Sequence, residues 1–238
     1  MKIITLDQIT GVLASSENPA YPDDNVLDNF RGVPWKSNVS AASTLVLDVS
    51  ANSNALMLSN MNSGTIGVEI KDSGASTIYG PTNHTIDLNN PNLWVDYDLE
   101  SGTAEITLTF SDPGTAVPYC GIARAGYAHD FPAFKYGLSE GFNDLSISKT
   151  YNNGADYYYF ISMLRQFSGS FLVERDDDFY TFMYSIIRKY GRGPYAMKLT
   201  DLSNYDWAVF GWMDTSLPKG SHGFFSHSDI SVSIGEGL

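Results

Sequence analysis

Residues 43 to 110 repeat one pattern, in which apolar and polar side chains alternate with a period of two. This alternation is typical of a β-strand with one buried face, because successive side chains of a strand point to opposite faces. Clusters of Gly, Asn, Ser and Pro between the segments indicate turns. Without helical periodicity between them, the segments predict an antiparallel β-sandwich rather than a parallel α/β sheet. The alternating segments are 44–49, 65–71, 93–99 and 105–110.

One segment of the second half has helical periodicity instead. From Phe179 to Tyr190, apolar residues recur at i, i+3, i+4, i+7, i+8 and i+11, which predicts an amphipathic helix from about Asp178 to Tyr190. The run Asp176 to Asp178 suits a helix N-terminus, and Gly191 suits its end. We expect further strands within 157–175, 208–213 and 230–234. The predicted fold is mostly β: a β-sandwich followed by an α+β domain.

Aromatic residues are distributed unevenly along the chain. Residues 1–128 hold 9 of the 32 Phe, Trp and Tyr residues, and residues 129–238 hold the other 23. Such a shift in core-building material predicts two separately packed domains, 1–128 and 129–238. The break is expected near residues 121–132, where polar residues and a proline interrupt the pattern.

Charge and cysteine content exclude several classes of protein. Lys and Arg total 14 against 27 Asp and Glu, and the net charge of −13 would repel a nucleic-acid backbone. No apolar run approaches the ~20 residues of a membrane span. The start of the chain, Met1 to Thr5, lacks the apolar stretch of a signal peptide. A single cysteine, Cys120, excludes an intramolecular disulfide and a multi-cysteine zinc site. We therefore expect a globular protein that binds no nucleic acid and does not insert into membranes.

The segment 15–37 resembles the opening of discoidin-like (coagulation factor 5/8 C-terminal-like) β-sandwich domains. The matching residues are the pair Asn25-x-x-Asp28 and the run Trp35-Lys36-Ser37. The resemblance covers roughly the first 125 residues. It implies a sandwich that binds sugars or other surface ligands through loops at one end, with Trp35 as a framework residue.

The second half is similar to segments of tail-tip and distal-tail-like proteins of tailed bacteriophages. The similar segments are Arg165 to Val173, the Asp-led helix with Tyr190 to Tyr195 after it, and the final strand within His227 to Leu238. This resemblance implies a phage or prophage structural protein located at the tail tip of the virion and made in the host cytoplasm. Its C-terminal domain would build a ring or dock to other tail proteins.

Residues with catalytic side chains do not form a known motif. The only close grouping is His222, Ser226, His227, Ser228 and Asp229, whose spacing matches no hydrolase. Cys120 lies next to an apolar segment and is expected to be a buried, inert thiol. We predict that the protein is not an enzyme.

Two acidic clusters are weak candidates for calcium. Asp23, Asp24 and Asp28 could gather around a cation, although their spacing is not that of an EF-hand loop and a plain turn is the alternative. The run 176–178 is explained by helix capping. No other cofactor is expected.

Candidate binding residues are mostly aromatic. Trp94 is expected to point outward, because its neighbours Leu93 and Val95 would occupy the buried face. It could contact a sugar there, or equally pack under a loop or against the second domain. Arg31 could reach a sugar hydroxyl or pair with Asp28. A further group is expected in a domain core or at an oligomer contact. That group contains Tyr157, Tyr158, Tyr159, Trp207 and Trp212.

These observations predict a non-enzymatic structural protein of a phage tail tip or baseplate. It would assemble as a homo-oligomeric ring with other tail proteins and present a sandwich that binds a host glycan or a partner. The alternative is a stand-alone carbohydrate-binding module protein, and a third hypothesis is an esterase or glycosidase. Nothing in the sequence fixes the carboxylate pair or base that such an enzyme needs.

Overall fold

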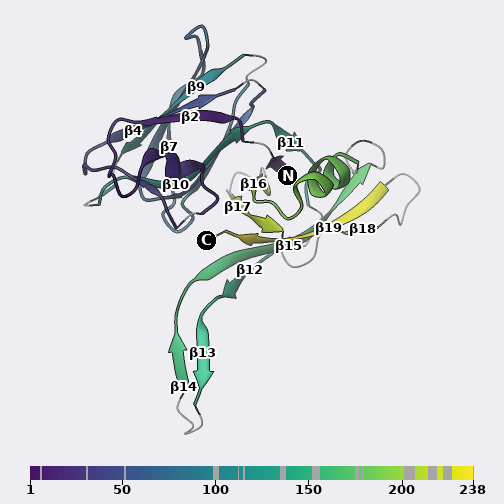
Figure 1. Ribbon diagram of the computed structural model, residues 1–238. Coiled ribbons are helices and arrows are strands. Elements are labelled where there is room, and N and C mark those ends of the chain that lie inside the picture. Colours follow the sequence, from purple (N-terminus) through teal and green to yellow (C-terminus); the bar gives the residue numbers. More distant parts are fainter. Residues whose placement is uncertain are drawn as a thin grey trace. The chain divides into compact units, whose positions relative to one another are not determined.

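The computed structural model shows a mostly β chain with several antiparallel sheets and little helix in its described part, which confirms the predicted fold class (Figure 1). It describes residues 1–5, 7–30, 32–50, 52–98, 102–111, 113–114, 116–134, 138–151, 156–174, 177, 180–200, 207–213, 219–221 and 227–237. Within these residues, no helix is long and apolar enough to cross a membrane.

The chain forms two compact units. Unit 1 contains Met1–Asp130 and Tyr195–Phe210, and unit 2 contains Phe131–Pro194 and Gly211–Leu238. Unit 1 is therefore discontinuous in sequence, whereas the uneven distribution of aromatic residues predicted two contiguous domains, 1–128 and 129–238. Whether each unit folds independently stays a prediction.

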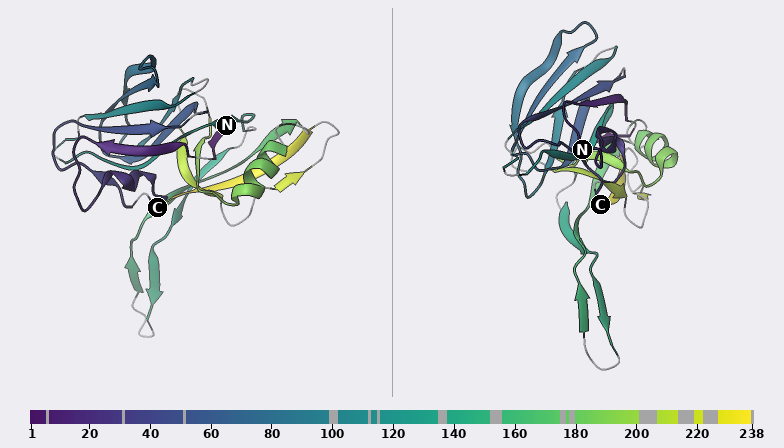
Figure 2. Two further views of the ribbon diagram at one scale, coloured as in Figure 1. Left: turned by 45° about the horizontal axis from the view of Figure 1, so that its top comes forward. Right: turned by 60° about the vertical axis from the view of Figure 1, so that its left-hand side comes forward.

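Unit 1 is built around a β-sandwich of two antiparallel sheets (Figures 1 and 2). One sheet has the order β2 (Ile9–Ala14), β4 (Ser43–Val49), β9 (Ala104–Ser111), β6 (Thr65–Asp72), β7 (Thr77–Thr85). The other has the order β3 (Trp35–Lys36), β10 (Tyr119–Gly126), β5 (Ala55–Met61), β8 (Asn92–Asp96). A short 3-10 helix, η1 (Asp23–Leu27), lies between β2 and β3 in sequence.

The core of the sandwich follows the alternation in the sequence. In β4, β6 and β9 every second residue is buried, and the side chains from both sheets form one apolar cluster. Members from the five-stranded sheet include Leu45, Val68 and Leu108, and Leu56 and Leu93 come from the other sheet. The strands predicted at 44–49, 65–71 and 105–110 are confirmed.

The four-stranded sheet of unit 1 is also covered on its second face. β1 (Lys2–Ile4) pairs with β11 (Ala128–Asp130) and with β16 (Tyr195–Lys198), and β17 (Ala208–Met213) begins in the same unit. Apolar residues of these strands form a second cluster with β5, β8 and β10. Its members are Ile4, Ala55, Met57, Trp94, Ile122, Ala128, Ala196, Ala208 and Phe210.

Unit 2 contains an antiparallel sheet in which β15 (Met163–Glu174) lies between β12 (Ser139–Asp144) and β19 (His227–Glu236). β18 (Lys219–Ser221) and the last residues of β17 also pair with β19. A separate two-stranded hairpin joins β13 (Ile147–Thr150) to β14 (Asp156–Tyr159).

The predicted helix is present in unit 2. Thr181–Ile187 (η2) winds as a π-helix, and Arg188–Tyr190 (α2) completes it. Phe182, Ile186 and Ile187 are buried, as the periodicity predicted, and Gly191 ends the helix with a φ of 67°. Of the expected capping aspartates, Asp176 and Asp178 lie outside the described residues, and Tyr180 at the N-cap position makes no side-chain capping hydrogen bond.

Candidate functional site

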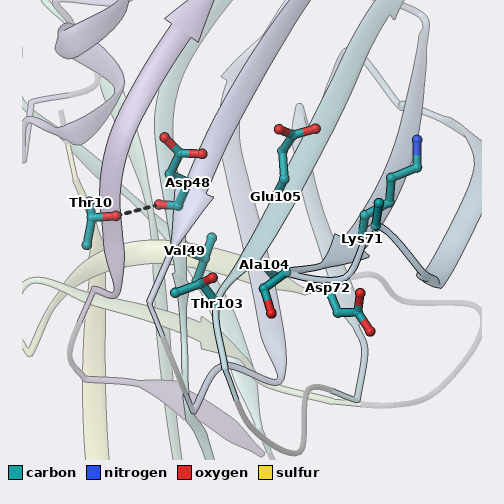
Figure 3. Close-up of a pocket in the computed structure, with 10 residues that line it drawn as sticks. Thr10, Asp48, Val49, Lys71, Asp72, Thr103, Ala104 and Glu105 are labelled. Carbon is teal, nitrogen blue, oxygen red and sulfur yellow. Dashed lines mark hydrogen bonds between the residues drawn. The ribbon is translucent and has the colours of Figure 1, made fainter.

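A pocket of about 450 Å³ lies at one end of the five-stranded sheet of unit 1 (Figure 3). β4 and β6 end there, and β9 begins there. Val49 and Ala104 are buried residues of its lining, and most of the other lining residues are polar. The polar side chains include Thr10, Asp48, Lys71, Asp72, Thr103 and Glu105.

Strand register places three charged side chains of the pocket in one row. In the ladders of β9, Glu105 lies opposite Asp48 of β4 on one side and opposite Lys71 of β6 on the other. Residues directly opposite each other share a face of the sheet, with Cβ atoms roughly 5 Å apart. Figure 3 shows the Asp48 and Glu105 carboxylates and the Lys71 ammonium on the same side of the strands.

A β-bulge in β2 shapes the edge of this row. The pairing of β2 with β4 shifts between Ile9 and Gly11, so Thr10 is the extra residue. Bulges commonly redirect a side chain, and Thr10 Oγ1 donates a hydrogen bond to the Asp48 carbonyl at 3.3 Å (Figure 3). Gly11 lies opposite Asp48, and its missing side chain leaves space for the Asp48 carboxylate.

Some charged groups of the pocket form ion pairs or hydrogen bonds with other protein groups, and others do not. Lys71 Nζ lies 3.0 Å from Glu69 Oε2, and Asp72 Oδ1 accepts the N–H groups of Gly74 and Ser76, each at 2.8 Å. The carboxylates of Asp48 and Glu105 make no hydrogen bond or ion pair within the described part of the chain. Two like charges directly opposite each other destabilise a β-ladder. A ligand that donates hydrogen bonds to both carboxylates would offset this repulsion.

The acidic residues of the chain do not assemble a metal site where the structure describes them. Among these residues, no group of three or more His, Cys, Asp and Glu side chains is close enough to hold an ion. Asp23, Asp24 and Asp28, the weak calcium candidates for which a plain turn was the alternative, form no such group. Asp23 Oδ2 instead accepts the N–H of Ala14 at 2.9 Å, and Asp24 is exposed.

Trp94 lies on the face of β8 opposite Leu93 and Val95, as the alternation predicted, but the expectation that it is exposed to a sugar is wrong. Its side chain is only 6% exposed and packs in the second apolar cluster of unit 1 with Met57, Ile122 and Phe210. Residues 195–210 return to unit 1 and supply part of that cluster, so both faces of β8 are buried. The indole Nε1 donates to Asp96 Oδ1 at 2.9 Å. Trp94 is therefore not available as an exposed plate for a sugar ring.

The other residues of the discoidin-like segment have structural partners. Trp35 is fully buried in the sandwich core, with its ring centroid 5.3 Å from that of Phe110. Asp28 is exposed and ends η1, and Arg31 lies outside the described residues. A buried guanidinium, Arg124, fixes this region by donating to the carbonyls of Val26, Leu27 and Asp28 at 2.8–3.1 Å.

The residues expected at an assembly contact differ from one another. Tyr157, Tyr158 and Tyr159 are exposed on β14, so the alternative that they form a domain core is wrong. Trp212 is partly buried and packs against Gly237 of its own unit, where an added Cβ would lie 2.3 Å from the indole ring.

The candidate catalytic residues form no described constellation. Cys120 is fully buried, and this burial raises the pKa of its thiol to about 12, so the thiol stays protonated at neutral pH. Its expected inert character is consistent with this environment. His222 and Ser226 lie outside the described residues, and Asp229 lies on β19 opposite Leu172 of β15.

No protein-family model matches the chain, and no curated protein sequence is similar to it. Solved structures are similar to about half of it, and three of them serve as examples. The family 32 carbohydrate-binding module of *Clostridium perfringens* NanJ, solved in complex with galactose, is 15% identical and has a TM-score of 0.43 over 54% of this chain and 100% of its own. A *Streptococcus pneumoniae* fucose-binding module has 15% identity and a TM-score of 0.37 over 52% and 96%. Reduced XRCC1, solved bound to the DNA polymerase β catalytic domain, has 12% identity and a TM-score of 0.40 over 52% and 98%.

None of the three structures is a phage tail component, and the tail-tip role stays a prediction.

No motif in the sequence marks the pocket residues. Asp48, Lys71 and Glu105 each occupy an ordinary outward position of an alternating strand. Only the pairing of β4, β9 and β6 aligns them, and the sequence alone does not give that register. The sequence does show a charged residue near one end of each of these three predicted strands, and this was the only indication of a shared site.

Proposed function

We propose that the protein is a non-catalytic glycan-binding protein and that its ligand occupies the pocket at the end of the five-stranded sheet. The observation that carries the proposal is the pair of adjacent carboxylates, Asp48 and Glu105, which have no partner within the described residues. Ionised carboxylates accept hydrogen bonds and cannot donate them, so their natural ligands are groups rich in O–H or N–H donors. Sugar hydroxyls supply such donors in pairs.

The remaining lining suits a sugar in two further ways. The hydroxyl groups of Thr10 and Thr103 can donate or accept, and the exposed Ala75 offers a small apolar surface to the C–H groups of a ring. The volume of about 450 Å³ is within the usual range of small-molecule sites, roughly 300–1,000 Å³. The resemblance of residues 15–37 to discoidin-like sandwiches also supports sugar binding.

The charge of the pocket restricts the class of glycan. Asp48, Asp72 and Glu105 contribute three carboxylates, and the only ammonium in the lining, Lys71, is already paired with Glu69. Acidic sugars such as sialic or uronic acids would be repelled. Neutral sugars and sugars with an amino group are therefore the proposed ligands.

A glycan array tests the proposal. The labelled full-length chain should bind neutral or amino-bearing glycans and should not bind sialylated ones. The Asp48→Asn/Glu105→Gln variant keeps the shape of both side chains and should lose this binding, while Asp24→Asn, an exposed carboxylate outside the pocket, should retain it. Absence of binding to any neutral or amino-bearing glycan, or unchanged binding by the double variant, would reject the proposal.

A further inference from the structure

The pocket at the end of the five-stranded sheet contains two carboxylates that repel each other. Asp48 and Glu105 lie directly opposite each other in the β4–β9 ladder, which places their Cβ atoms roughly 5 Å apart on one face (Figure 3). Both residues are exposed, and within the described residues neither carboxylate accepts a hydrogen bond or forms an ion pair. The protein itself therefore leaves this repulsion without a counter-charge.

The single ammonium of the pocket lining is already paired. Lys71 lies opposite Glu105 in the β6–β9 ladder, a position next to this carboxylate. Its Nζ atom lies 3.0 Å from Glu69 Oε2, two residues earlier on the same strand and outside the lining. The cation that would neutralise Asp48 and Glu105 has to come from a ligand.

Two carboxylates suit an ammonium group better than a metal ion. Calcium takes roughly six to eight oxygen ligands, and among the described residues no group of three or more His, Cys, Asp and Glu side chains could hold a metal. A primary ammonium has three N–H donors, and two acceptors at ~2.8 Å from one tetrahedral nitrogen stand roughly 4.6 Å apart. This separation is close to the cross-strand spacing of Asp48 and Glu105, so one ammonium can donate to both.

A neutral substituent of a sugar satisfies the pair less well. A hydroxyl group donates a single hydrogen, and an N-acetyl group donates a single N–H, so each can bond only one of the two carboxylates. Neither group carries a positive charge, so the repulsion between Asp48 and Glu105 remains. The pair therefore discriminates in favour of a free amine.

The charge of unit 1 adds a long-range attraction for cations. Unit 1 contains 17 acidic and 6 basic residues, and unit 2 contains 10 acidic and 8 basic residues. Unit 1 thus carries −11 of the net charge of −13. Asp72, a third carboxylate of the lining, is held by the N–H groups of Gly74 and Ser76 and adds to the negative potential of the pocket. A cationic sugar is attracted to the unit that contains the pocket.

We propose that the pocket selects sugars with a free, protonated amino group, and that this ammonium donates hydrogen bonds to Asp48 and Glu105 together. The inference rests on the proposed glycan-binding function and narrows its ligands from neutral and amino sugars to amino sugars. The volume of about 450 Å³ leaves room for the ring that bears the amine.

Sugars that differ in one substituent test the proposal. Calorimetry on the full-length chain, at a mildly acidic pH that protonates amines, compares glucose, galactose and mannose oligosaccharides in which the same carbon carries an amine, an N-acetyl group or a hydroxyl. In the series that binds most tightly, the amine should bind at least ~10-fold more tightly than its two counterparts, because it bonds two carboxylates and they bond one. Added salt should weaken binding of the amine, since salt screens exposed charges.

Variants test the shared role of the two carboxylates. Asp48→Asn and Glu105→Gln keep the shape of each side chain, and each should reduce the preference for the amine. The double variant should abolish it. Asp24→Asn, which removes an exposed carboxylate outside the pocket, is the matched control and should keep the full preference. Thermal melts check that every variant folds.

The outcomes separate this inference from the proposed function. Equal affinity for the amine and its N-acetyl or hydroxyl counterpart would overturn the inference and leave glycan binding standing. A preference that survives either single variant unchanged would show that the two carboxylates do not act together, which also overturns it. If no sugar of any series binds, the proposed function itself fails, and the inference fails with it.

Discussion

Gly11 lies directly opposite Asp48 in the ladder between β2 and β4, and a Cβ atom added to Gly11 would stand 2.9 Å from Asp48 Oδ2. Real Cβ atoms essentially never approach an oxygen this closely, so the carboxylate would have to move. Because the affected atom is the end of an exposed side chain, the fold can tolerate the change. The glycine therefore preserves the position of a proposed ligand-binding group.

We predict that Gly11→Ala weakens glycan binding without unfolding the protein. Losing one well-placed hydrogen bond to a charged group would cost about tenfold in Kd, or ~1.4 kcal/mol. Titration calorimetry with a glycan bound on the array gives the Kd, and a thermal melt monitors folding. Unchanged affinity would show that the Asp48 carboxylate does not contact the ligand.

We predict that Phe182→Ala destabilises unit 2 by ~3–5 kcal/mol, because truncating a buried Phe leaves a cavity. The Phe182 ring packs edge-on against Phe171 and Phe131, with centroid distances of 5.1 and 5.3 Å. Chemical denaturation gives the free energy of unfolding. The neighbouring Thr181→Ala should cost far less, and equal small losses from both variants would contradict the packing of this helix.

We predict that Trp94→Ala lowers the melting temperature, with a loss of ~3–5 kcal/mol in the free energy of unfolding. The indole is buried between strands of unit 1, so its removal leaves a cavity. Leu88→Ala, a truncation at an exposed position, is the control. Should Trp94→Ala melt like the unmodified protein, the second apolar cluster would not contribute as described.

We predict that Asp96 stabilises unit 1 in a pH-dependent way. Burial alone would raise the pKa of Asp96, but hydrogen bonds from Trp94 and Lys2 and the charges of Lys198 and Lys2 outweigh it and hold the pKa below its ordinary value of 3.8. A carboxyl group whose pKa is lowered by folding contributes stability above its unfolded pKa and loses it as pH falls through the folded pKa. Asp96→Asn should therefore melt earlier than the unmodified protein at neutral pH.

The difference in melting temperature between Asp96→Asn and the unmodified protein should shrink as the pH falls below 3.8. It should be modest throughout, because the Asp96 side chain is 41% exposed and solvent screens its ion pairs with Lys2 and Lys198. Melting curves at a series of pH values test this. A difference that stays constant down to strongly acidic pH would exclude an electrostatic origin.

The alternating pattern correctly predicted the strands that have one face in the apolar core and the other face toward solvent. β4, β6 and β9 alternate because one face of each lies in the core and the other faces outward. In β8, Leu93, Trp94 and Val95 are all buried, because residues more than 100 positions later cover the outer face of its sheet. A local sequence pattern cannot indicate that residues so distant in sequence cover Trp94. For this reason the expected exposure of Trp94 was wrong.

The helix was predictable because its periodicity is local. Phe182, Ile186 and Ile187 are three or four residues apart and reach the same apolar environment. The candidate site was not predictable in this way. Asp48 and Glu105 are 57 positions apart, and their adjacency depends on the register of a ladder formed by distant segments.

The central claim is that the Asp48 and Glu105 carboxylates bind a glycan. The most direct measurement is a calorimetric titration of the unmodified chain, Asp48→Asn/Glu105→Gln and Asp24→Asn with the neutral or amino-bearing glycan that gives the strongest array signal. We predict that the double variant loses at least about tenfold in affinity, while Asp24→Asn binds like the unmodified chain. Equal affinity of the double variant and the unmodified chain would contradict the account.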